Sequence, residues 1–306
     1  MFWARSLGPK LETSGSMSRF LIWNGWGLGA MVKTDFIISE MNNSQVSLVA
    51  ILEPNQSSSR IQEFSLHLIL WGYLHGNPPN SYIWIFLKDH ISVDLMSLSD
   101  QDLNTRITAG TNVFFSFIYA MCTSQGKEVL WSVLEYYNHG SSPWIIGGDL
   151  NIIVCPEERK GGGAFPRSAR QAFVSFMARN GLMDAGFVGI NFTLCNNQCG
   201  GRCSYSVLDH FLIYNAAIAM FPDCKVGHLT RGMSDLSPIR LLLGAGVVSG
   251  QRAQFSNSWV EDPGFFEVVR EAWVFHHQGN LWGALNRNLR GAQDSSSGVE
   301  EDDPRS

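Results

Sequence analysis

The chain has 306 residues, 45% of them apolar, which is enough for one large domain or two ordinary ones with a buried core. Its net charge of −5 argues against a broad basic surface for nucleic acids, but it allows a local basic groove. No apolar run reaches the roughly 18 residues of a membrane helix, and the first residues lack a signal-peptide core. We therefore expect an intracellular protein, in the nucleus or the cytoplasm, with free cysteines and no membrane contact.

Residues 1–18 are rich in Ser and Gly without periodicity, and we expect a flexible leader. A short apolar strand, Phe20-Leu21-Ile22-Trp23, then runs into Asn24 and several glycines. The amide of Asn24 fits an ordinary turn or a polar site at the strand end. A second apolar strand, Val46–Leu52, ends on Glu53-Pro54, and the proline is expected to hold Glu53 in an extended conformation. Glu53 is equally well interpreted as an exposed loop acid or as a metal ligand.

The middle of the chain continues with strand-like segments at Tyr82–Leu87 and Val113–Tyr119. Apolar residues at helical spacing predict a helix over Lys127–Tyr137. This helix leads into the most informative stretch, Pro143-Trp144-Ile145-Ile146-Gly147-Gly148-Asp149-Leu150-Asn151. An extended backbone would point Asp149 and Asn151 to the same side, where they suit a water, a hard cation or a phosphate. Alone, the pattern G-D-x-N also fits ordinary turn chemistry.

Later segments repeat the alternation of helix and strand. Ser168 is suited to begin a helix with Phe173, Phe176 and Met177 on one face, and Gly181 is suited to end it. The strand Val207–Tyr214 carries Asp209. A last core strand, Ile239–Leu243, follows Ser234-Asp235-Leu236-Ser237-Pro238.

The composition changes after residue 243. We expect the main domain to span 19–243, followed by a linker and an amphipathic helix over 244–291 and a disordered acidic tail over 292–306. Within the domain, polar residues follow or lie beside the strand ends. They are Asn24, Glu53, Tyr119, Asp149, Asn151, Asp209 and Asp235. An α/β scaffold with a site at one edge of its sheets fits this pattern.

The order of these motifs is specific, although each motif is weak. W-N-x-x-G, strands ending on Glu and Tyr, G-D-x-N, a late L-D and S-D-x-S-P-I resemble the endonuclease/exonuclease/phosphatase superfamily. The closer resemblance is to the apurinic-type endonuclease domain of plant non-LTR (LINE-type) retrotransposon polyproteins. Three stretches carry it: YAMCTSQGKEVLWSVL, PWIIGGDLNIIVCPEERKGGGAFPRSARQAFVSFMARNGLMDAGFVGINFTLCNN and FPDCKVGHLTRGMSDLSPI. It covers about 20–243, and 255–275 looks like the spacer before a reverse transcriptase, which is absent here.

The resemblance implies a four-layer α/β sandwich of two packed mixed sheets. It also implies Mg²⁺-dependent hydrolysis of a phosphodiester, with Mn²⁺ as a substitute ion and DNA as the partner. The residue roles that it implies are Asn24, Glu53 and Asp235 at the metal; Tyr119 and Asn151 at the phosphate, with Asn196 beside them; Asp149 at the attacking water; and Asp209 as the partner of a catalytic histidine.

Several positions depart from the pattern that the resemblance implies. The histidine of S-D-H-S-P is Leu236 here, and leucine neither accepts a proton nor donates a hydrogen bond. The arginine of W-N-x-R-G is Trp26, and R-L-D-R has become Val207-Leu208-Asp209-His210. Since a lost general acid–base group costs about 10²–10⁴ in rate, we expect impaired catalysis. The alternatives are a non-catalytic remnant that binds metal or nucleic acid weakly, an active DNA-nicking endonuclease, and an enzyme for small phosphoesters.

Overall fold

The computed structural model describes most of the first 244 residues. The described ranges are 18–29, 31–68, 72–75, 82–108, 112–137, 140–162, 167–198, 202–232 and 234–244. Nearly all of the predicted leader lies outside them, as do the predicted acidic tail and all but the first residue of the predicted spacer. The domain boundaries therefore stay predictions.

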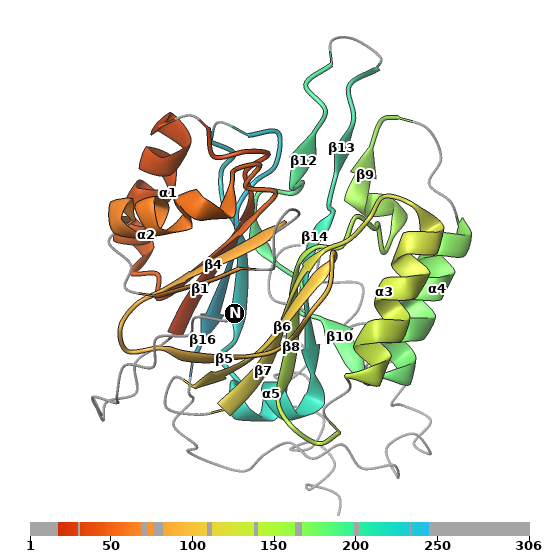
Figure 1. The fold of residues 1–306 in the computed structure, drawn as a ribbon. Helices are drawn as coiled ribbons and strands as arrows, with labels where there is room; N and C mark the ends of the chain where they lie inside the picture. Colours follow the sequence, from red (N-terminus) through yellow and green to blue (C-terminus); the bar gives the residue numbers. More distant parts are fainter. Residues whose placement is uncertain are drawn as a thin grey trace, which may run out of the picture.

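Two mixed β-sheets form the centre of the described chain (Figure 1). The first has, in spatial order, β11 (Val188–Gly189), β15 (Lys225–His228), β16 (Ile239–Leu243), β1 (Ser18–Asn24), β2 (Leu48–Leu52), β4 (Ile83–Leu87) and β3 (Gly72–His75). The second has β10 (Leu182–Asp184), β14 (Asp209–Tyr214), β8 (Trp144–Asp149), β7 (Asn112–Tyr119), β6 (Asp102–Thr108) and β5 (Ser92–Leu98). A small third sheet contains β12 (Leu194–Cys195), β13 (Tyr205–Ser206) and β9 (Arg159–Lys160).

Helices cover the outer faces of both large sheets (Figure 1). The first sheet is covered by α1 (Met31–Ser44) and α2 (Ile61–His67), the latter preceded by the 3₁₀ turn η1 (Ser58–Arg60). The second sheet is covered by α3 (Ser124–Tyr136) and α4 (Arg167–Arg179). The remaining described helical segments are η2 (Pro156–Glu158) and α5 (Asn215–Met220). The resulting order of layers, helix–sheet–sheet–helix, confirms the predicted four-layer α/β sandwich.

Aromatic and aliphatic side chains fill the space between the sheets. Phe20 of β1 packs edge-on against Phe115 of β7, with ring centroids 5.7 Å apart, and Phe115 also contacts Phe211 of β14. The outer helix pair packs through aromatic rings as well, because Trp131 of α3 stacks on Phe176 of α4 at 4.9 Å. The apolar face predicted for the helix after Ser168 therefore lies in the core.

Two parallel strand pairs bring the predicted site residues to one edge. β1 runs parallel to β2, with Asn24 opposite Leu52. β7 runs parallel to β8, with Tyr119 opposite Asp149. Because the carboxyl ends of parallel strands lie at the same edge of a sheet, each sheet presents its polar residues at a single end.

The structure also contains elements that the sequence patterns did not predict. Among them are α1, α2, α5 and the antiparallel hairpin of β5 and β6. Within the described part of the chain, no helix has both the length and the apolar character that crossing a membrane requires.

Candidate active site

Four of the predicted residues form one hydrogen-bonded cluster. The amide Nδ2 of Asn24 donates to Glu53 Oε2 at 3.0 Å and to Asp149 Oδ2 at 3.1 Å. The hydroxyl of Tyr119 donates to Glu53 Oε1. Asn24 and Asp149 are buried, whereas Glu53 and Tyr119 are half-buried at the surface of the cluster. Since Asn24 and Glu53 come from the first sheet and Tyr119 and Asp149 from the second, the cluster joins the two sheets.

Glu53 reaches the cluster through a backbone conformation that we did not predict. Its φ is +48°, in the left-handed region, and the expected extended conformation before Pro54 is therefore wrong. Two backbone hydrogen bonds hold this geometry: Glu53 N donates to Tyr82 O at 2.8 Å, and Gly27 N donates to Glu53 O at 2.8 Å. Non-glycine residues in this region are uncommon and concentrate at functional sites.

The glycines before Asp149 allow the close packing that positions its carboxylate. Gly148 has φ +140°, and a Cβ there would collide with the carbonyl oxygen of Ile118 in the neighbouring strand. A Cβ at Gly147 would collide with the ring of Phe211. The two glycines are therefore required by neighbouring protein atoms.

Asn151 lies beside Asp149 in a turn. Its φ is +51°, so the extended backbone assumed for the pair does not continue past the strand. Its N–H donates to Asp149 Oδ1 at 2.9 Å, and its Nδ2 donates to Ala120 O at 3.0 Å. This is the turn chemistry that we had kept as an alternative, and it fixes the orientation of the Asp149 carboxylate.

Asp209 lies directly opposite Asp149 in the pairing of β14 with β8. Its side chain is buried, and Oδ2 has no hydrogen-bond partner among the described residues. Burial raises the pKa of Asp209 to about 6, although hydrogen bonding with Thr193 and the charge of His210 oppose that shift. Burial and the charge of Asp209 together raise the pKa of Asp149 well above its ordinary value. Two carboxyl groups therefore share a dry environment.

Leu236 occupies a firmly held position next to this environment. Its N–H donates to Ser234 Oγ at 3.2 Å, and its carbonyl accepts from Trp23 Nε1 at 3.0 Å. Ser234 Oγ donates in turn to the carbonyl of Asn24 at 3.1 Å. The leucine is buried and forms an isolated bridge with Leu194. The segment expected to present a histidine is thus tied to the strand end that carries Asn24, and it presents an apolar side chain.

Solved structures share this architecture at low sequence identity. The AP endonuclease LMAP from Leishmania major matches with a TM-score of 0.59 and 16% identity, over 78% of this chain and 92% of that one. The endonuclease domain of TRAS1, a telomere-specific non-LTR retrotransposon, matches with 0.56 and 12%, over 75% and 99%. An endonuclease/exonuclease/phosphatase family protein from Bacteroides thetaiotaomicron matches with 0.54 and 12%, over 78% and 98%. The chain has the endonuclease/exonuclease/phosphatase fold. No family model and no curated protein matches the sequence.

Asp235 and Asn196, which the sequence analysis placed at the site, lie outside the hydrogen-bonded cluster. The carboxylate of Asp235 accepts from Asn197 Nδ2, and its carbonyl accepts from Cys195 N at 3.0 Å. Asn196 closes a turn instead: its Nδ2 donates to Arg202 O at 2.9 Å and its Oδ1 accepts from Ser204 N at 2.9 Å. Both side chains support the β12–β13 region.

The cluster supplies oxygen ligands that fit a hard cation. Within the described ranges, no three His, Cys, Asp or Glu side chains converge into a ready-made metal site. Mg²⁺ commonly uses only one or two protein carboxylates, with water and substrate phosphate in its other positions. Glu53 and Asp149 meet that requirement. The Oδ1 of Asn24 accepts from Trp26 N and its Nδ2 donates to both acids, so its predicted place at the metal stays a prediction.

Two further side chains near the site have no motif that would reveal them. Thr193 is fully buried, and its Oγ1 accepts from Leu208 N at 3.0 Å and Asp209 N at 3.3 Å. Lys127 is buried in the first turn of α3, where its Nζ donates to Cys122 O at 3.2 Å. Burial lowers the pKa of Lys127, while the charges of Cys122 and Asp149 oppose that shift. In the sequence, Lys127 looks like any other polar residue of an amphipathic helix, so nothing there distinguishes it.

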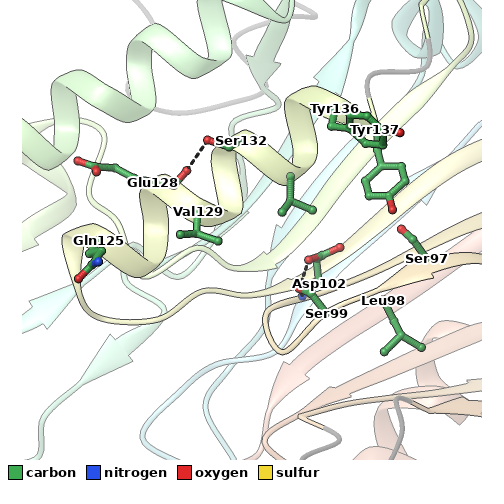
Figure 2. A pocket seen from close by; sticks show the side chains of 11 residues that line it. Ser97, Leu98, Ser99, Asp102, Gln125, Glu128, Val129, Ser132, Tyr136 and Tyr137 are labelled. Carbon is green, nitrogen blue, oxygen red and sulfur yellow. Dashed lines mark hydrogen bonds between the residues drawn. The ribbon is translucent and has the colours of Figure 1, made fainter.

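A separate cleft of about 720 Å³ lies between α3 and the β5–β6 hairpin (Figure 2). Its lining includes Glu128, Val129 and Tyr136 of the helix, together with Ser97 and Asp102 of the hairpin. None of the predicted site residues lines this cleft.

Proposed function

We propose that the chain is a Mg²⁺-dependent phosphodiesterase domain for DNA whose hydrolysis is impaired at Leu236. The observation that carries the proposal is the cluster of Asn24, Glu53, Tyr119 and Asp149 at the edge where the two sheets meet. The fold adds support, since its solved neighbours include AP and retrotransposon endonucleases. Action on chromosomal DNA implies a nuclear location.

Each residue of the cluster has a definite role in this proposal. Asp149, as a carboxylate, takes the proton of the attacking water. Tyr119, whose hydroxyl donates to Glu53 in the free site, donates to the phosphate instead when substrate is bound. Asn151 offers its second amide N–H to the same phosphate. Glu53 and Asp149 would hold the cation, which would supply Lewis-acid stabilisation of the developing charge. Asp235 as a further cation ligand and Asn196 as a further phosphate contact stay predictions, since both side chains hydrogen-bond within the β12–β13 region here.

The impairment follows from the side chain at position 236. A histidine there would donate a hydrogen bond to the phosphate oxygens and use Asp209 to orient its ring. Leucine provides neither function, and Asp209 Oδ2 is left without a partner. This orphaned oxygen favours the second candidate function, a non-catalytic remnant that retains the fold and binds metal or nucleic acid weakly.

Nicking of supercoiled plasmid separates these functions. We would compare the wild-type chain, Leu236→His, Asp149→Ala and the double variant, each with Mg²⁺ and with a chelator. We expect Leu236→His to raise the nicking rate by about 10²–10⁴-fold, and Asp149→Ala to abolish nicking in both backgrounds. Efficient wild-type nicking that depends on Asp149 would show that the histidine is dispensable. If no folded variant nicks the plasmid, the non-catalytic remnant is favoured. Hydrolysis of a small phosphomonoester would instead favour an enzyme for small phosphoesters.

Cation binding tests the site independently of catalysis. Calorimetric titration with Mg²⁺ and with Mn²⁺ should show weaker binding for Glu53→Gln than for the wild-type chain. Glu128→Gln removes a carboxylate from the separate cleft and is the matched control. Equal affinities for all three proteins would mean that Glu53 is not a metal ligand.

A further inference from the structure

Trp26 stands out from the other tryptophans of the described chain. Its side chain is 62% exposed, whereas Trp23, Trp84, Trp131 and Trp144 are buried. It occupies the position where the resemblance implied an arginine, so no role passes to it from that comparison. It lies two residues after Asn24, whose amide holds Glu53 and Asp149 together. A large exposed ring is therefore placed at the rim of the candidate active site.

The backbone presents this ring from a fixed position. Trp26 has φ +42°, which is rare for a bulky residue. Its N–H donates to Asn24 Oδ1 at 3.1 Å, and its carbonyl accepts from Lys33 Nζ at 3.1 Å. The two residues that follow are also bound, since Gly27 N donates to Glu53 O and Leu28 N donates to Pro54 O. The loop thus holds the indole in the solvent without the freedom of an ordinary surface turn.

A positive charge accompanies the ring. Lys33 Nζ, which is half-buried, donates to the carbonyls of Gly25 at 2.7 Å and Trp26 at 3.1 Å. An ammonium group carries three donors, and its charge attracts phosphate oxygens. An aromatic face beside a cation is the pairing that proteins use on single-stranded nucleic acids, where bases stack and the backbone follows the charge.

We propose that Trp26 is a stacking platform for a nucleobase next to the phosphate that the cluster receives, with Lys33 contacting the adjacent backbone. The proposal rests on the proposed function and extends it, because it names the substrate class as a strand with an unpaired or unstacked base. Small phosphoesters lack such a base, and duplex DNA offers one only where its stacking is disturbed. Stacking on Trp26 requires no catalysis, so it holds for an impaired domain as well.

Fluorescence anisotropy with two labelled single-stranded oligonucleotides tests the proposal. One carries ordinary bases, and the other has the same phosphates with abasic residues at all central positions. We expect Trp26→Ala to weaken binding of the first about fivefold or more and to leave the second unchanged. Trp26→Phe should retain most of the affinity for the first. Tyr136→Ala removes a ring that is 84% exposed in the separate cleft and should change neither.

Three results would overturn the proposal. They are equal effects of Trp26→Ala on both oligonucleotides, no effect on either, and no measurable binding by the wild-type chain. Urea unfolding of each variant identifies any loss of folding, and Trp26→Phe is the second test if the alanine variant unfolds. Lys33→Gln should reduce the salt dependence of binding by about one phosphate contact for both oligonucleotides.

The same measurements distinguish this proposal from the proposed function. Asp149→Ala and Leu236→His alter plasmid nicking, but they should preserve the preference for the oligonucleotide with bases. A base preference that depends on Trp26, without nicking by any variant, supports stacking and contradicts hydrolysis. The opposite outcome supports hydrolysis and contradicts stacking. In that outcome Leu236→His nicks plasmid at the same rate with or without Trp26→Ala, and the chain binds the oligonucleotides with and without central bases equally well.

Discussion

Asp209 and His210 are neighbours in β14, and alternation along the strand places their side chains on opposite faces of the second sheet. Both side chains are buried. On one face, Asp209 Oδ2 has no partner among the described residues. On the other, His210 uses both ring nitrogens: Nδ1 lies 2.8 Å from Asp184 Oδ2, and Nε2 lies 3.1 Å from the carbonyl of Ile152.

The partners of His210 determine its charge. A carboxylate and a carbonyl are both acceptors, so the ring satisfies them only when both nitrogens carry protons. Burial lowers the pKa of His210, but Asp184 outweighs burial and the pKa rises to about 9. The pair also ties the turn after Asn151 to β10 at the sheet edge. The polar pair that supports the fold is complete, whereas the pair that the proposed reaction needs lacks its histidine.

Restoring the missing partner should give the largest effect. In the Leu236→His background, Asp209→Asn should remove most of the gain in nicking, about 10²–10⁴-fold, because an amide does not fix the histidine tautomer or its charge. Plasmid nicking rates of the single and double variants measure this dependence. A full gain without the carboxylate would mean that Asp209 and position 236 are not coupled.

Breaking the complete pair should reduce stability. Asp184→Asn leaves a buried imidazolium without its counter-charge, and we expect the free energy of unfolding to fall by about 3 kcal/mol. Urea denaturation at pH 7 measures this loss. The exposed ion pair of Arg179 with Glu135 provides the control, since Glu135→Gln should cost less than about 1 kcal/mol. Similar losses for the two variants would contradict the special role of the His210 pair.

The charge of His210 should also appear in the pH dependence. Its pKa is raised on folding, so its stabilisation is complete below the unfolded value of about 6.5 and disappears as the pH rises through 9. Between pH 7 and pH 9 we expect a loss on the order of 2 kcal/mol in the wild-type chain and none of this component in His210→Gln.

Other groups around His210 do not reproduce that component. Burial raises the pKa of Asp184, but His210 outweighs burial and lowers it, so Asp184 is ionised throughout this range. Burial together with the charge of His210 keeps His228 neutral by lowering its pKa to about 4. Burial raises the pKa of the thiols of Cys155 and Cys224 to about 12, and this effect is the same in the wild-type chain and in His210→Gln. Parallel pH profiles for the wild-type chain and His210→Gln would therefore mean that the ring is not charged.

The smallest effect concerns the orphaned carboxylate. Burial raises the pKa of Asp209 to about 6, so its ionised form destabilises the fold above that pH, and stability returns as the pH falls toward 4. With a chelator present, Asp209→Asn should stabilise the chain at pH 7.5 by about 1 kcal/mol, since the unpaired amide offsets part of the gain. The advantage should be lost near pH 4.5 and turn into a small destabilisation, because the cost of the unpaired amide remains when Asp209 is protonated, as urea midpoints would show.

Sequence patterns predicted much of the scaffold, because short apolar runs such as Phe20–Trp23, and Ile239–Leu243 with its single polar residue Arg240, are typical of buried strands. They also placed Asn24, Glu53, Tyr119 and Asp149 at strand ends, where the structure joins them. The conformation of Glu53 could not be predicted, because its positive φ depends on Tyr82 and Gly27, which are distant in sequence.

The surroundings of Asp235 and Asn196 could not be predicted for the same reason. Both lie in motifs whose order is informative, but their hydrogen bonds are made with Asn197, Arg202 and Ser204 in a local hairpin. Helix α1 has no acidic residue in its first turn and no basic residue in its last, so the usual terminal signals are absent. Partner choice across the sheets is set by tertiary packing, which one sequence does not display.

The place of β1 in its sheet has a consequence for how the chain folds. β1 lies between β2 and β16, and Phe20 pairs with Leu241 near the far end of the described domain. At about 5–20 residues per second, synthesis needs roughly 10–40 s to supply that second neighbour. During this interval one side of an apolar strand has open backbone groups, and such long-range pairing is slow. Nascent chains that end before residue 239 should therefore depend on chaperones, and release of the completed β16 should end that dependence.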